Sequence, residues 1–196
     1  MTTKTLNISE EQLVDYSKAH NEPSWMTELR KKALKLTETL EMPKPDKTKL
    51  RKWDFDTFKQ HHTTGDSYHQ LTDLPKSVKE IIDVENSENL IIQHNNDLAY
   101  TQVSDQAKND GVIIEGLSEA LVNHSDLVQK YFMTKAVDVD EHRLTALHTA
   151  LVNGGIFVYV PKNTVVEHPI QYVVLHDDEQ ASFYNHVIIV TEESAE

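Results

Sequence analysis

The chain has 196 residues, with 32 Asp and Glu against 19 Lys and Arg, so its formal charge is −13, and it contains no cysteine. The missing cysteines exclude disulfides, thiolate metal sites, thiolate-ligated iron–sulfur clusters and cysteine nucleophiles within this sequence. The negative charge disfavours broad binding to nucleic acid or anionic membranes, which depends on Lys and Arg. The apolar runs are far shorter than the ~20 residues of a spanning helix, and residues 1–12 lack the apolar segment of a secretory signal. We therefore expect a cytoplasmic protein.

The charge is distributed unevenly along the chain. Residues 1–60 hold 12 basic and 10 acidic side chains, whereas residues 61–196 hold 7 basic and 22 acidic ones. Val, Ile and Tyr concentrate after Gly154. These shifts predict three segments: an N-terminal helical region at 1–60, a mixed strand and helix segment at 61–139, and a helix followed by a strand-rich core at 140–196.

Two helices are predicted in the first segment. Ser9-Glu10-Glu11-Gln12 has the pattern of a capping box, which begins a helix that runs to about residue 20. A second helix begins at Glu22-Pro23, and its apolar residues recur at steps of three and four between 25 and 40, as on one face of an amphipathic helix. The prolines of Met42-Pro43-Lys44-Pro45 end it, because they cannot donate a backbone hydrogen bond.

The middle of the chain predicts shorter elements. Residues 74–82 are expected to form a short helix after Pro75. Asn89–His94 and Leu98–Val103 predict a hairpin around a turn at residues 95–97. The remaining expected elements are a strand at Val112–Ile114 and helices at Ser118–Asn123 and Asp126–Phe132, the last capped by Ser125 or Asp126.

The last segment begins with a helix and continues in strands. Asp140–Val152 is predicted as a helix that ends at Asn153-Gly154-Gly155. The strands expected after it are Ile156–Val160, Val165–Val166, Ile170–Leu175 and Phe183–Thr191. Few residues follow the last strand, so the sheet is left with exposed edges, which folded proteins avoid. This favours the N-terminal part of a longer chain; the alternative is a complete domain whose last strand pairs inward.

The eleven histidines do not form a metal-binding pattern. His142 and His148 are six residues apart, so they lie on different faces of a helix. His61-His62 is expected in an exposed loop and His168 in a turn. Glu141-His142 lacks the second histidine of the metalloprotease motif, and the chain has no nucleophile elbow, Walker A loop or Gly-x-Gly-x-x-Gly motif. The sequence therefore assigns no catalytic, cofactor-binding or metal-ligating residue.

Two kinds of charged tract require an interpretation. The acidic pair Asp138/Asp140 and the run Asp177–Glu179 are expected in solvated turns. The basic tract Arg30–Lys59 is accompanied by three aromatic residues, Trp53, Phe55 and Phe58. Because the rest of the chain is acidic, this tract is interpreted as a helix face plus a charged linker, which can pair with acidic groups within the chain or across an interface. The residues by themselves favour a scaffold or interaction protein over an enzyme.

Two long stretches resemble a known family. Residues 21–34, NEPSWMTELRKKAL, and residues 146–170, ALHTALVNGGIFVYVPKNTVVEHPI, resemble signatures of the SufB/SufD family of iron–sulfur cluster assembly proteins. Residues 111–121, GVIIEGLSEAL, are similar to the strand and helix before the second signature. His148 stands where the family often has Asn. The missing cysteines and the short N-terminus favour the SufD branch.

The resemblance implies an α+β fold. N-terminal helices and a small α/β segment would lead into the first coils of a right-handed parallel β-helix, truncated here, at residues 140–196. Trp25 and Arg30 would anchor the second helix, and Gly154-Gly155 would cap a helix. The β-helix corners would be set by Pro161 and Pro169.

The resemblance also implies a function. The chain would be a non-catalytic scaffold subunit that acts with a SufB-like paralogue and a SufC-like ABC ATPase. No cofactor is expected in this segment, and an iron–sulfur cluster or flavin in the full complex is left open. Because a truncated stack of coils exposes one end, we expect a homodimer to cover that end.

Two other functions stay open. One is a stand-alone acidic protein-interaction domain with a basic helical arm, which requires the chain to be complete. The other is a β-helix enzyme that acts on a polysaccharide. Such an enzyme needs paired carboxylates, and the strand-rich segment offers Glu167 and Asp177–Glu179.

Overall fold

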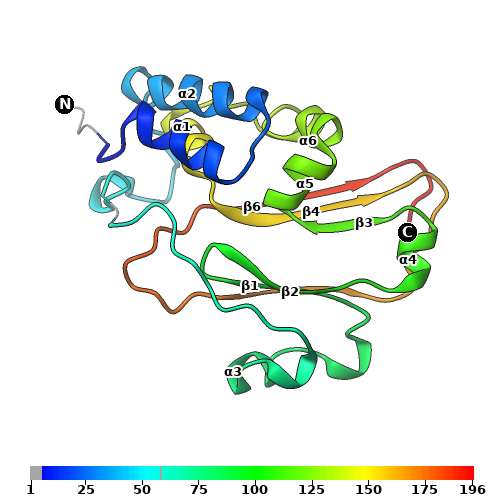
Figure 1. Cartoon of the computed structure of the whole chain (residues 1–196). Helices are drawn as coiled ribbons and strands as arrows, with labels where there is room; N and C mark the ends of the chain where they lie inside the picture. The colour runs from blue at the N-terminus through cyan, green and yellow to red at the C-terminus, as the bar shows by residue number, and fades with distance from the viewer. Residues whose placement is uncertain (1–5, 58) are drawn as a thin grey trace. The chain divides into compact units, whose positions relative to one another are not determined.

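The computed structural model describes residues 6–57 and 59–196, and Phe58 of the basic tract lies outside the described residues. The helices and strands, most of them labelled in Figure 1, group into two compact units. Unit 1 comprises Met1–His61 and Leu121–Val152, and unit 2 comprises His62–Ala120 and Asn153–Glu196. Each unit is therefore assembled from two separate stretches of the chain.

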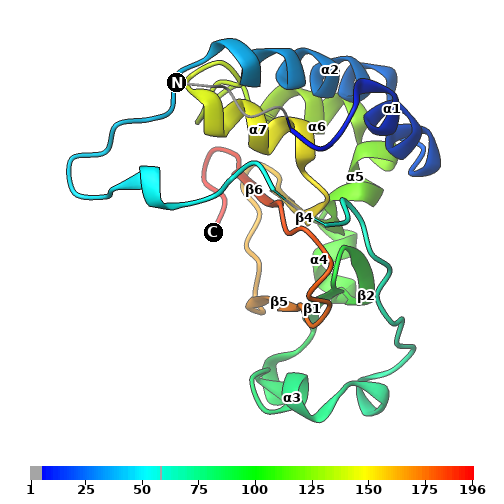
Figure 2. The same cartoon turned by 90° about the vertical axis from the view of Figure 1, so that its left-hand side faces the viewer.

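Unit 1 is helical. Its elements are α1 (Glu10–Ala19), α2 (Ser24–Thr39), the 3₁₀ helix η1 (Leu50–Lys52), α6 (Ser125–Tyr131) and α7 (Arg143–Leu151). The helix α5 (Leu117–Asn123) crosses the boundary between the units. Figure 2 shows α2 lying along α7 and α1, against which it packs.

The two N-terminal helices begin where the sequence predicts. The Ser9 side chain accepts a hydrogen bond from the Gln12 backbone N–H at 3.2 Å, and Gln12 Oε1 accepts one from the Ser9 N–H at 2.8 Å. The predicted capping box is thus confirmed. Pro23 precedes the first turn of α2 as its N-cap, and the helix ends at Thr39, before the two prolines.

The buried face of α2 carries a charge at its centre. Its buried residues are Met26, Arg30, Ala33 and Thr37. Arg30 Nη2 lies 2.6 Å from Glu22 Oε1, and the two side chains are 2% and 4% exposed. Arg30 Nη1 also donates to the carbonyl of Ala150 in α7 at 2.9 Å. Arg30 therefore anchors α2, as the resemblance implies.

Trp25 provides a second anchor for α2. Its Nε1 donates to the Ser125 hydroxyl at 2.9 Å, and its ring lies 6.3 Å from that of Phe132. Ser125 or Asp126 was expected to cap α6, but the N-cap of that helix is His124, whose side chain makes no capping bond. That prediction is wrong because both residues lie inside the helix, where the Ser125 hydroxyl accepts from Trp25.

Unit 2 contains two three-stranded sheets. Its strands are β1 (Asn89–His94), β2 (Asp97–Gln102), β3 (Ile113–Gly116), β4 (Gly154–Val160), β5 (Ile170–Leu175) and β6 (Asn185–Thr191). Short helical elements accompany them: η2 (Leu71–Asp73), α3 (Lys76–Lys79), η3 (Val84–Asn86) and α4 (Asp105–Asn109). The helix α4 was not expected from the sequence.

The two sheets have the strand orders β2-β1-β5 and β3-β4-β6, and they lie face to face (Figure 1). In each sheet the central strand pairs with one antiparallel and one parallel neighbour. β1 is antiparallel to β2 and parallel to β5, whereas β4 is antiparallel to β3 and parallel to β6. From β4 the chain crosses to β5 in the other sheet and returns as β6. One complete turn thus places β6 beside β4.

The core of unit 2 surrounds β1 on both faces. Ile91 points toward the second sheet and packs in one cluster with Ile114 of β3 and with Ile156 and Val158 of β4. Leu90 and Ile92 point the other way, into a cluster with Leu74, Val78 and Ile82 around α3. Six consecutive buried residues in β1 follow from this two-sided packing.

Several predicted elements are confirmed and others are corrected. The hairpin is present, with a tight turn at Asn95-Asn96 in which Asn95 has a φ of 53°. Gly154-Gly155 does not cap α7, which ends at Leu151 with Val152 as its C-cap; both glycines begin β4, and Gly155 has a φ of 131°. Val165–Val166 is not a strand, because the Val166 N–H donates to the carbonyl of Glu196 instead of to a ladder partner.

The predicted α+β class is confirmed: the described residues form helices and small mixed sheets. The truncated β-helix stays a proposal. The division into segments 1–60, 61–139 and 140–196 stays a prediction.

Candidate functional site

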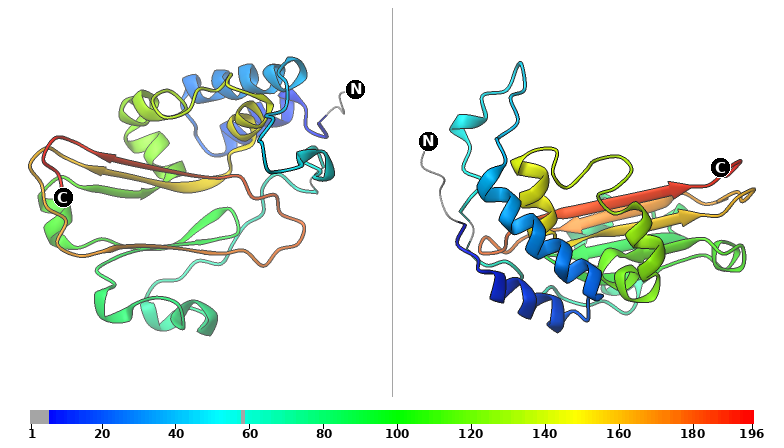
Figure 3. Two further views of the ribbon diagram at one scale, coloured as in Figure 1. Left: turned by 180° about the vertical axis from the view of Figure 1, so that it is seen from behind. Right: turned by 90° about the horizontal axis from the view of Figure 1, so that it is seen from above.

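The strands β5 and β6 form an open edge of unit 2. Each has one hydrogen-bonded neighbour, β1 or β4, and each is the last strand in its sheet. Both lie on the same side of the unit, nearest the viewer in the left view of Figure 3. Their outer backbone N–H and C=O groups can pair with further strands.

The core between the sheets is unfinished at this edge. In the parallel register, Val187 lies beside Ile156 and Ile189 beside Val158, so both side chains point toward the inter-sheet core. Val187 is nevertheless 47% exposed and Ile189 66% exposed, whereas Ile156 and Val158 are buried. The row of apolar side chains between the two sheets therefore continues to the open edge, where its last members, Val187 and Ile189, are exposed.

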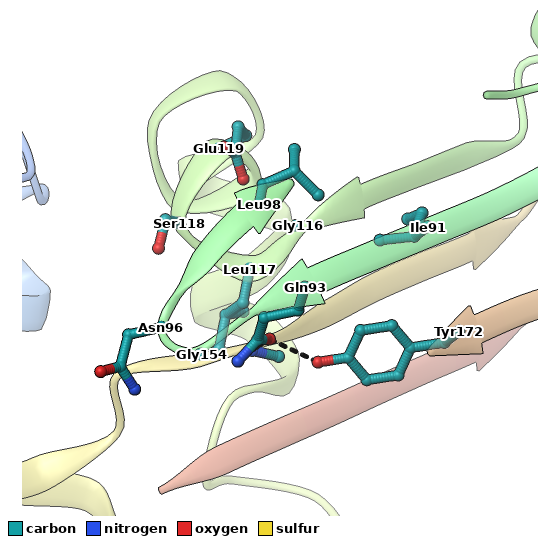
Figure 4. A pocket seen from close by; sticks show the side chains of 11 residues that line it. Ile91, Gln93, Asn96, Leu98, Gly116, Leu117, Ser118, Glu119, Gly154 and Tyr172 are labelled. Carbon is teal, nitrogen blue, oxygen red and sulfur yellow. Dashed lines mark hydrogen bonds between the residues drawn. The ribbon is translucent and has the colours of Figure 1, made fainter. Parts of the chain in front are cut away.

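A network of polar side chains lies next to this edge, at the N-terminal end of β4 (Figure 4). Gln93 Oε1 accepts from the Gly155 N–H at 2.9 Å and from the Tyr172 hydroxyl at 2.5 Å, while Gln93 Nε2 donates to the carbonyl of Asn95 at 2.7 Å. Burial raises the pKa of Tyr172 to about 12, so its hydroxyl keeps its proton and donates. These bonds tie β1, β4 and β5 together across the two sheets.

Three buried asparagines extend the network into the loops. Asn95 Oδ1 accepts from the backbone N–H groups of Asp177 and Asp178, both at 3.2 Å. Asn96 and Asn153 each donate from Nδ2 to the carbonyl of Ser182 at 3.1 Å. From the sequence, Asn95 and Asn96 were expected in a turn and Asn153 at the end of a helix. Their buried role depends on contacts with residues about 30 to 90 positions away, for which the sequence carries no local signal.

Glu119 lines the same pocket as Gln93 and Tyr172. Burial raises the pKa of its carboxyl, and the charges of Glu115 and Asp97 raise it further, while its own backbone N–H opposes them. Gly116 makes room for it, because a Cβ at that position would collide with the Glu119 carboxylate. The pocket thus combines one carboxyl whose pKa is raised with amide groups that are already engaged in structural hydrogen bonds.

His94 ends β1 and joins two loops. Its Nδ1 accepts from the backbone N–H of Asp66 at 2.8 Å, so Nε2 carries the proton and donates to Asp177 Oδ1 at 2.9 Å. The hydrogen bond from His94 holds the pKa of Asp177 below its usual range. This arrangement fixes loop positions and was not expected from the sequence.

The other histidines that the sequence analysis considered also have structural partners. His61 Nε2 bonds the carbonyl of Leu151, and His62 Nε2 lies 2.9 Å from Asp97 Oδ1, so this pair is half-buried and not fully exposed as expected. His142 is the N-cap of α7 and accepts from the Thr145 N–H at 3.1 Å. His168 Nδ1 lies 3.7 Å from Glu88 Oε2. His148 is a half-buried residue of α7.

The acidic tracts occupy turns, as predicted. Asp138 and Asp140 are exposed in the turn before α7. Within Asp177–Glu179, Asp177 pairs with His94 and Asp178 accepts from the Gln180 N–H at 2.8 Å. Glu167 is exposed. The described residues hold no group of three or more His, Cys, Asp or Glu side chains arranged to bind a metal ion.

The basic tract runs from α2 into an irregular segment. Lys31 and Lys35 on α2 pair with Glu10 of α1 at 3.7 and 3.3 Å. Trp53 is 64% exposed and its ring stacks on Phe55, with centroids 6.0 Å apart and planes at 11°. Within the described ranges, 6–57 and 59–196, no helix is long and apolar enough to cross a membrane.

Comparison with known proteins identifies relatives of this chain. Residues 9–172 match the family described as the SufBD protein N-terminal region. The chain is 46% identical over 189 residues to the iron–sulfur cluster assembly protein SufD of Bacillus subtilis, an alignment that covers 96% of this chain and 43% of the relative. It is 29% identical over 200 residues to a SufBD family protein of Pyrococcus horikoshii, covering 97% and 44%. The chain therefore spans less than half the length of these relatives.

Proposed function

The chain belongs to the SufBD family of iron–sulfur cluster assembly proteins, and we propose that it is a non-catalytic scaffold subunit of the SUF assembly complex. The similarity to a protein named SufD supports the SufD branch. In this role the iron–sulfur cluster is the group that the complex assembles, not a resident cofactor of this chain. Because these 196 residues contain no cysteine, thiolate ligands for the cluster would come from a partner or from sequence outside this chain.

The observation that carries this proposal is the open edge formed by β5 and β6. The path from β4 to β5 to β6, with parallel pairing in both sheets, supports a parallel β-helix whose first complete turn is this one. A following coil would cover Val187 and Ile189 and continue both sheets. A stack of coils presents an extended rigid surface, which suits a scaffold for other subunits.

The proposed partners are a SufB-like paralogue and a SufC-like ABC ATPase, in the cytoplasm. Family membership supports such an assembly in general. The polar network around Gln93 and the three asparagines supports a structural role for the interior of unit 2, because its hydrogen-bonding groups are engaged with one another.

The test uses the protein at its full natural length in its own cells. An affinity tag on the protein should co-purify an ABC-type ATPase and a SufBD paralogue, identified by mass spectrometry. Deletion of the gene should lower the activity of iron–sulfur enzymes, and reintroduction of the wild-type gene should restore it. Unchanged iron–sulfur enzyme activities in the deletion strain would contradict the proposal.

A further inference from the structure

The first residues of unit 2, 62–68, form an irregular segment, defined here as the strap. Backbone N–H groups of the strap donate to acceptors on the β1–β2 hairpin: Thr63 to Asn96 Oδ1 at 2.9 Å, Gly65 to Asp97 Oδ2 at 3.3 Å, Asp66 to His94 Nδ1 at 2.8 Å and Tyr68 to the Ala99 carbonyl at 2.8 Å. Most of these acceptors are side-chain atoms. The strap is therefore held by the side chains of the hairpin turn and not by a regular strand ladder.

His94 is the acceptor that a change of pH near neutrality removes. Amide and carbonyl oxygens do not titrate in this range, and carboxylates take up a proton only at about pH 4. An imidazole takes up a proton between about pH 5 and 8. The backbone N–H of Asp66 can only donate, so His94 Nδ1 carries no hydrogen in this structure. A proton on Nδ1 would face the Asp66 N–H and end this hydrogen bond.

The other side of the His94 ring keeps its partner in both protonation states. Nε2 donates to Asp177 Oδ1 at 2.9 Å, and the His94 side chain is 8% exposed. Asn95 Oδ1 accepts from the Asp177 N–H at 3.2 Å, which holds that loop in place. Because the hydrogen bond from His94 lowers the pKa of Asp177, this carboxylate stays ionised at mildly acidic pH. Uptake of a proton therefore changes the Nδ1 side of the ring, where the strap lies.

A replacement acceptor lies beside Nδ1. Asp66 Oδ2 is 3.7 Å from His94 Nδ1, and the Asp66 side chain is 76% exposed, so it can rotate at the surface. An imidazolium donates from both nitrogens, and a carboxylate accepts such a donor with a short, charge-assisted hydrogen bond. The same residue thus offers a backbone donor to the neutral ring and a side-chain acceptor to the protonated one.

The other titratable side chains near the ring keep their state in this pH range. Tyr68 stacks on His94, with centroids 6.5 Å apart and planes at 10°. Burial, and then the charges of Asp66 and Asp177, raise the pKa of Tyr68, so its hydroxyl stays neutral. Asp97, opposite His94 in the hairpin, lies 2.9 Å from His62 Nε2. Since a carboxylate can accept from a neutral or a protonated imidazole, the His62–Asp97 contact persists on acidification.

We propose that the strap is a pH-sensitive clasp: when His94 takes up a proton from solvent, Nδ1 exchanges the backbone N–H of Asp66 for the carboxylate of Asp66, and the backbone at Asp66 moves away from the hairpin. The bonds of Thr63 to Asn96 and of Tyr68 to the Ala99 carbonyl do not titrate, so they stay in place as the fixed ends of the clasp. The device lies within unit 2 and is independent of the scaffold role.

Two-dimensional ¹H–¹⁵N NMR of the 196-residue chain from about pH 8 to pH 5 tests this proposal. The amide proton of Asp66 should move upfield as its hydrogen bond is lost, with the same midpoint as the ring nitrogens of His94. Amide exchange at Asp66, corrected for the intrinsic effect of pH, should become at least about threefold faster, as expected for the loss of one hydrogen bond. The amides of Thr63 and Tyr68 should keep their protection.

Two variants separate His94 from the other histidine of the clasp. His94→Asn places an amide oxygen near the position of Nδ1 and cannot take up a proton, so the Asp66 transition should disappear. The matched control, His62→Gln, removes the histidine of the strap and keeps a donor toward Asp97, so the transition should remain. Circular dichroism should show that both variants are folded.

Three results would overturn the proposal: an Asp66 amide that does not titrate in the wild type, an Asp66 midpoint that differs from that of the His94 ring, or an unchanged transition in His94→Asn. The second comparison needs the wild-type chain alone, so it decides the matter even if His94→Asn does not fold.

Discussion

Arg30 shows how a single side chain organises unit 1. Its position on α2 places it at the centre of the buried face, where Glu22 balances its charge and Ala150 accepts one of its N–H groups. The guanidinium also lies 5.0 Å from the centroid of the Tyr16 ring, which adds a cation–π contact. A planar group with several donors suits this site, because it bonds a carboxylate and a carbonyl at once.

Arg30→Ala should lower the free energy of unfolding by about 3–5 kcal/mol, because it leaves the buried Glu22 carboxylate without its partner. Urea denaturation followed by circular dichroism measures this change. Lys35→Ala is the control, since Lys35 pairs with Glu10 at the exposed surface and should cost less than about 1 kcal/mol. Equal losses in both variants would contradict the role given to Arg30.

The Arg30–Glu22 pair also predicts a response to acid. Burial by itself would raise the pKa of Glu22, but the Arg30 charge and hydrogen bonds from Arg30 and Ser17 outweigh burial and lower it. A carboxyl with a lowered folded-state pKa stabilises the protein above its unfolded-state value, about 4.3, and this stability is lost as the pH falls through the lower folded value. Urea midpoints measured from pH 7 to pH 3 should fall less steeply in Glu22→Gln than in the wild type. Parallel curves would contradict the assignment.

Gly155→Ala should be strongly destabilising. Its φ of 131° costs a residue with a side chain about 1–3 kcal/mol, and a Cβ at this position would collide with the backbone carbonyl of His186. Gly111→Ala is the matched control: its φ is also positive, at 75°, but its nearest neighbour is Pro161 at 3.7 Å. Thermal unfolding should show a much larger loss of stability for Gly155→Ala than for Gly111→Ala. A similar loss in both variants would mean that the close approach of β4 and β6 contributes little to the cost of the substitution.

At the scale of elements, β6 is the strand that the sequence identifies most clearly and the structure leaves most exposed. Its run of β-branched residues predicts the strand, and its parallel pairing with β4 decides which side chains face the inter-sheet core. Alternation alone does not say which face is buried, because a shift of one residue exchanges the two faces.

Ile189→Lys tests whether a further coil covers this edge. In the 196-residue chain Ile189 is 66% exposed, so the substitution should change the free energy of unfolding by less than about 0.5 kcal/mol. In a chain extended to the length of the relatives, a covering coil would bury the lysine and raise the cost to at least about 2 kcal/mol. The control is Thr191→Lys in both chains, at the exposed end of β6. A negligible effect of Ile189→Lys in the longer chain would argue against the β-helix.

At the scale of the whole molecule, charge determines which partners are favourable. The basic residues gather between 30 and 59, while residues 61–196 carry 22 acidic side chains. A net charge of −13 repels polyanions at long range, so the basic segment is better suited to acidic protein surfaces than to nucleic acid.

The protein should therefore bind duplex DNA and single-stranded RNA with dissociation constants weaker than about 100 μM at physiological salt. Fluorescence anisotropy with labelled oligonucleotides measures this. The Lys47→Glu/Lys49→Glu variant is the control, since it weakens any binding through the basic tract Arg30–Lys59. Tighter, salt-dependent binding that this variant abolishes would show that the basic tract recognises phosphate instead.

Local sequence patterns were sufficient to predict much of the secondary structure. The capping box at Ser9, the hairpin at Asn95-Asn96 and the strand β5 at Ile170–Leu175 were all predictable, because each rests on contacts or propensities within a few residues. Gly154-Gly155 was misread as a helix cap. Glycine permits both a cap and a tight strand approach, and the neighbouring His186 backbone, 31 residues away, decides between them.

The sequence by itself determined the α+β class, the absence of thiolate chemistry in these residues and, through two signatures, the SufBD family. The tertiary structure alone decided that Arg30 is buried with Glu22 and the Ala150 carbonyl as its partners, that Gln93 and three asparagines form an internal network, and that Val187 and Ile189 end an uncovered core. The physical reason is the same in each case. Periodicity and capping are local, whereas the burial of a polar group or the exposure of an apolar one depends on which distant segment lies beside it.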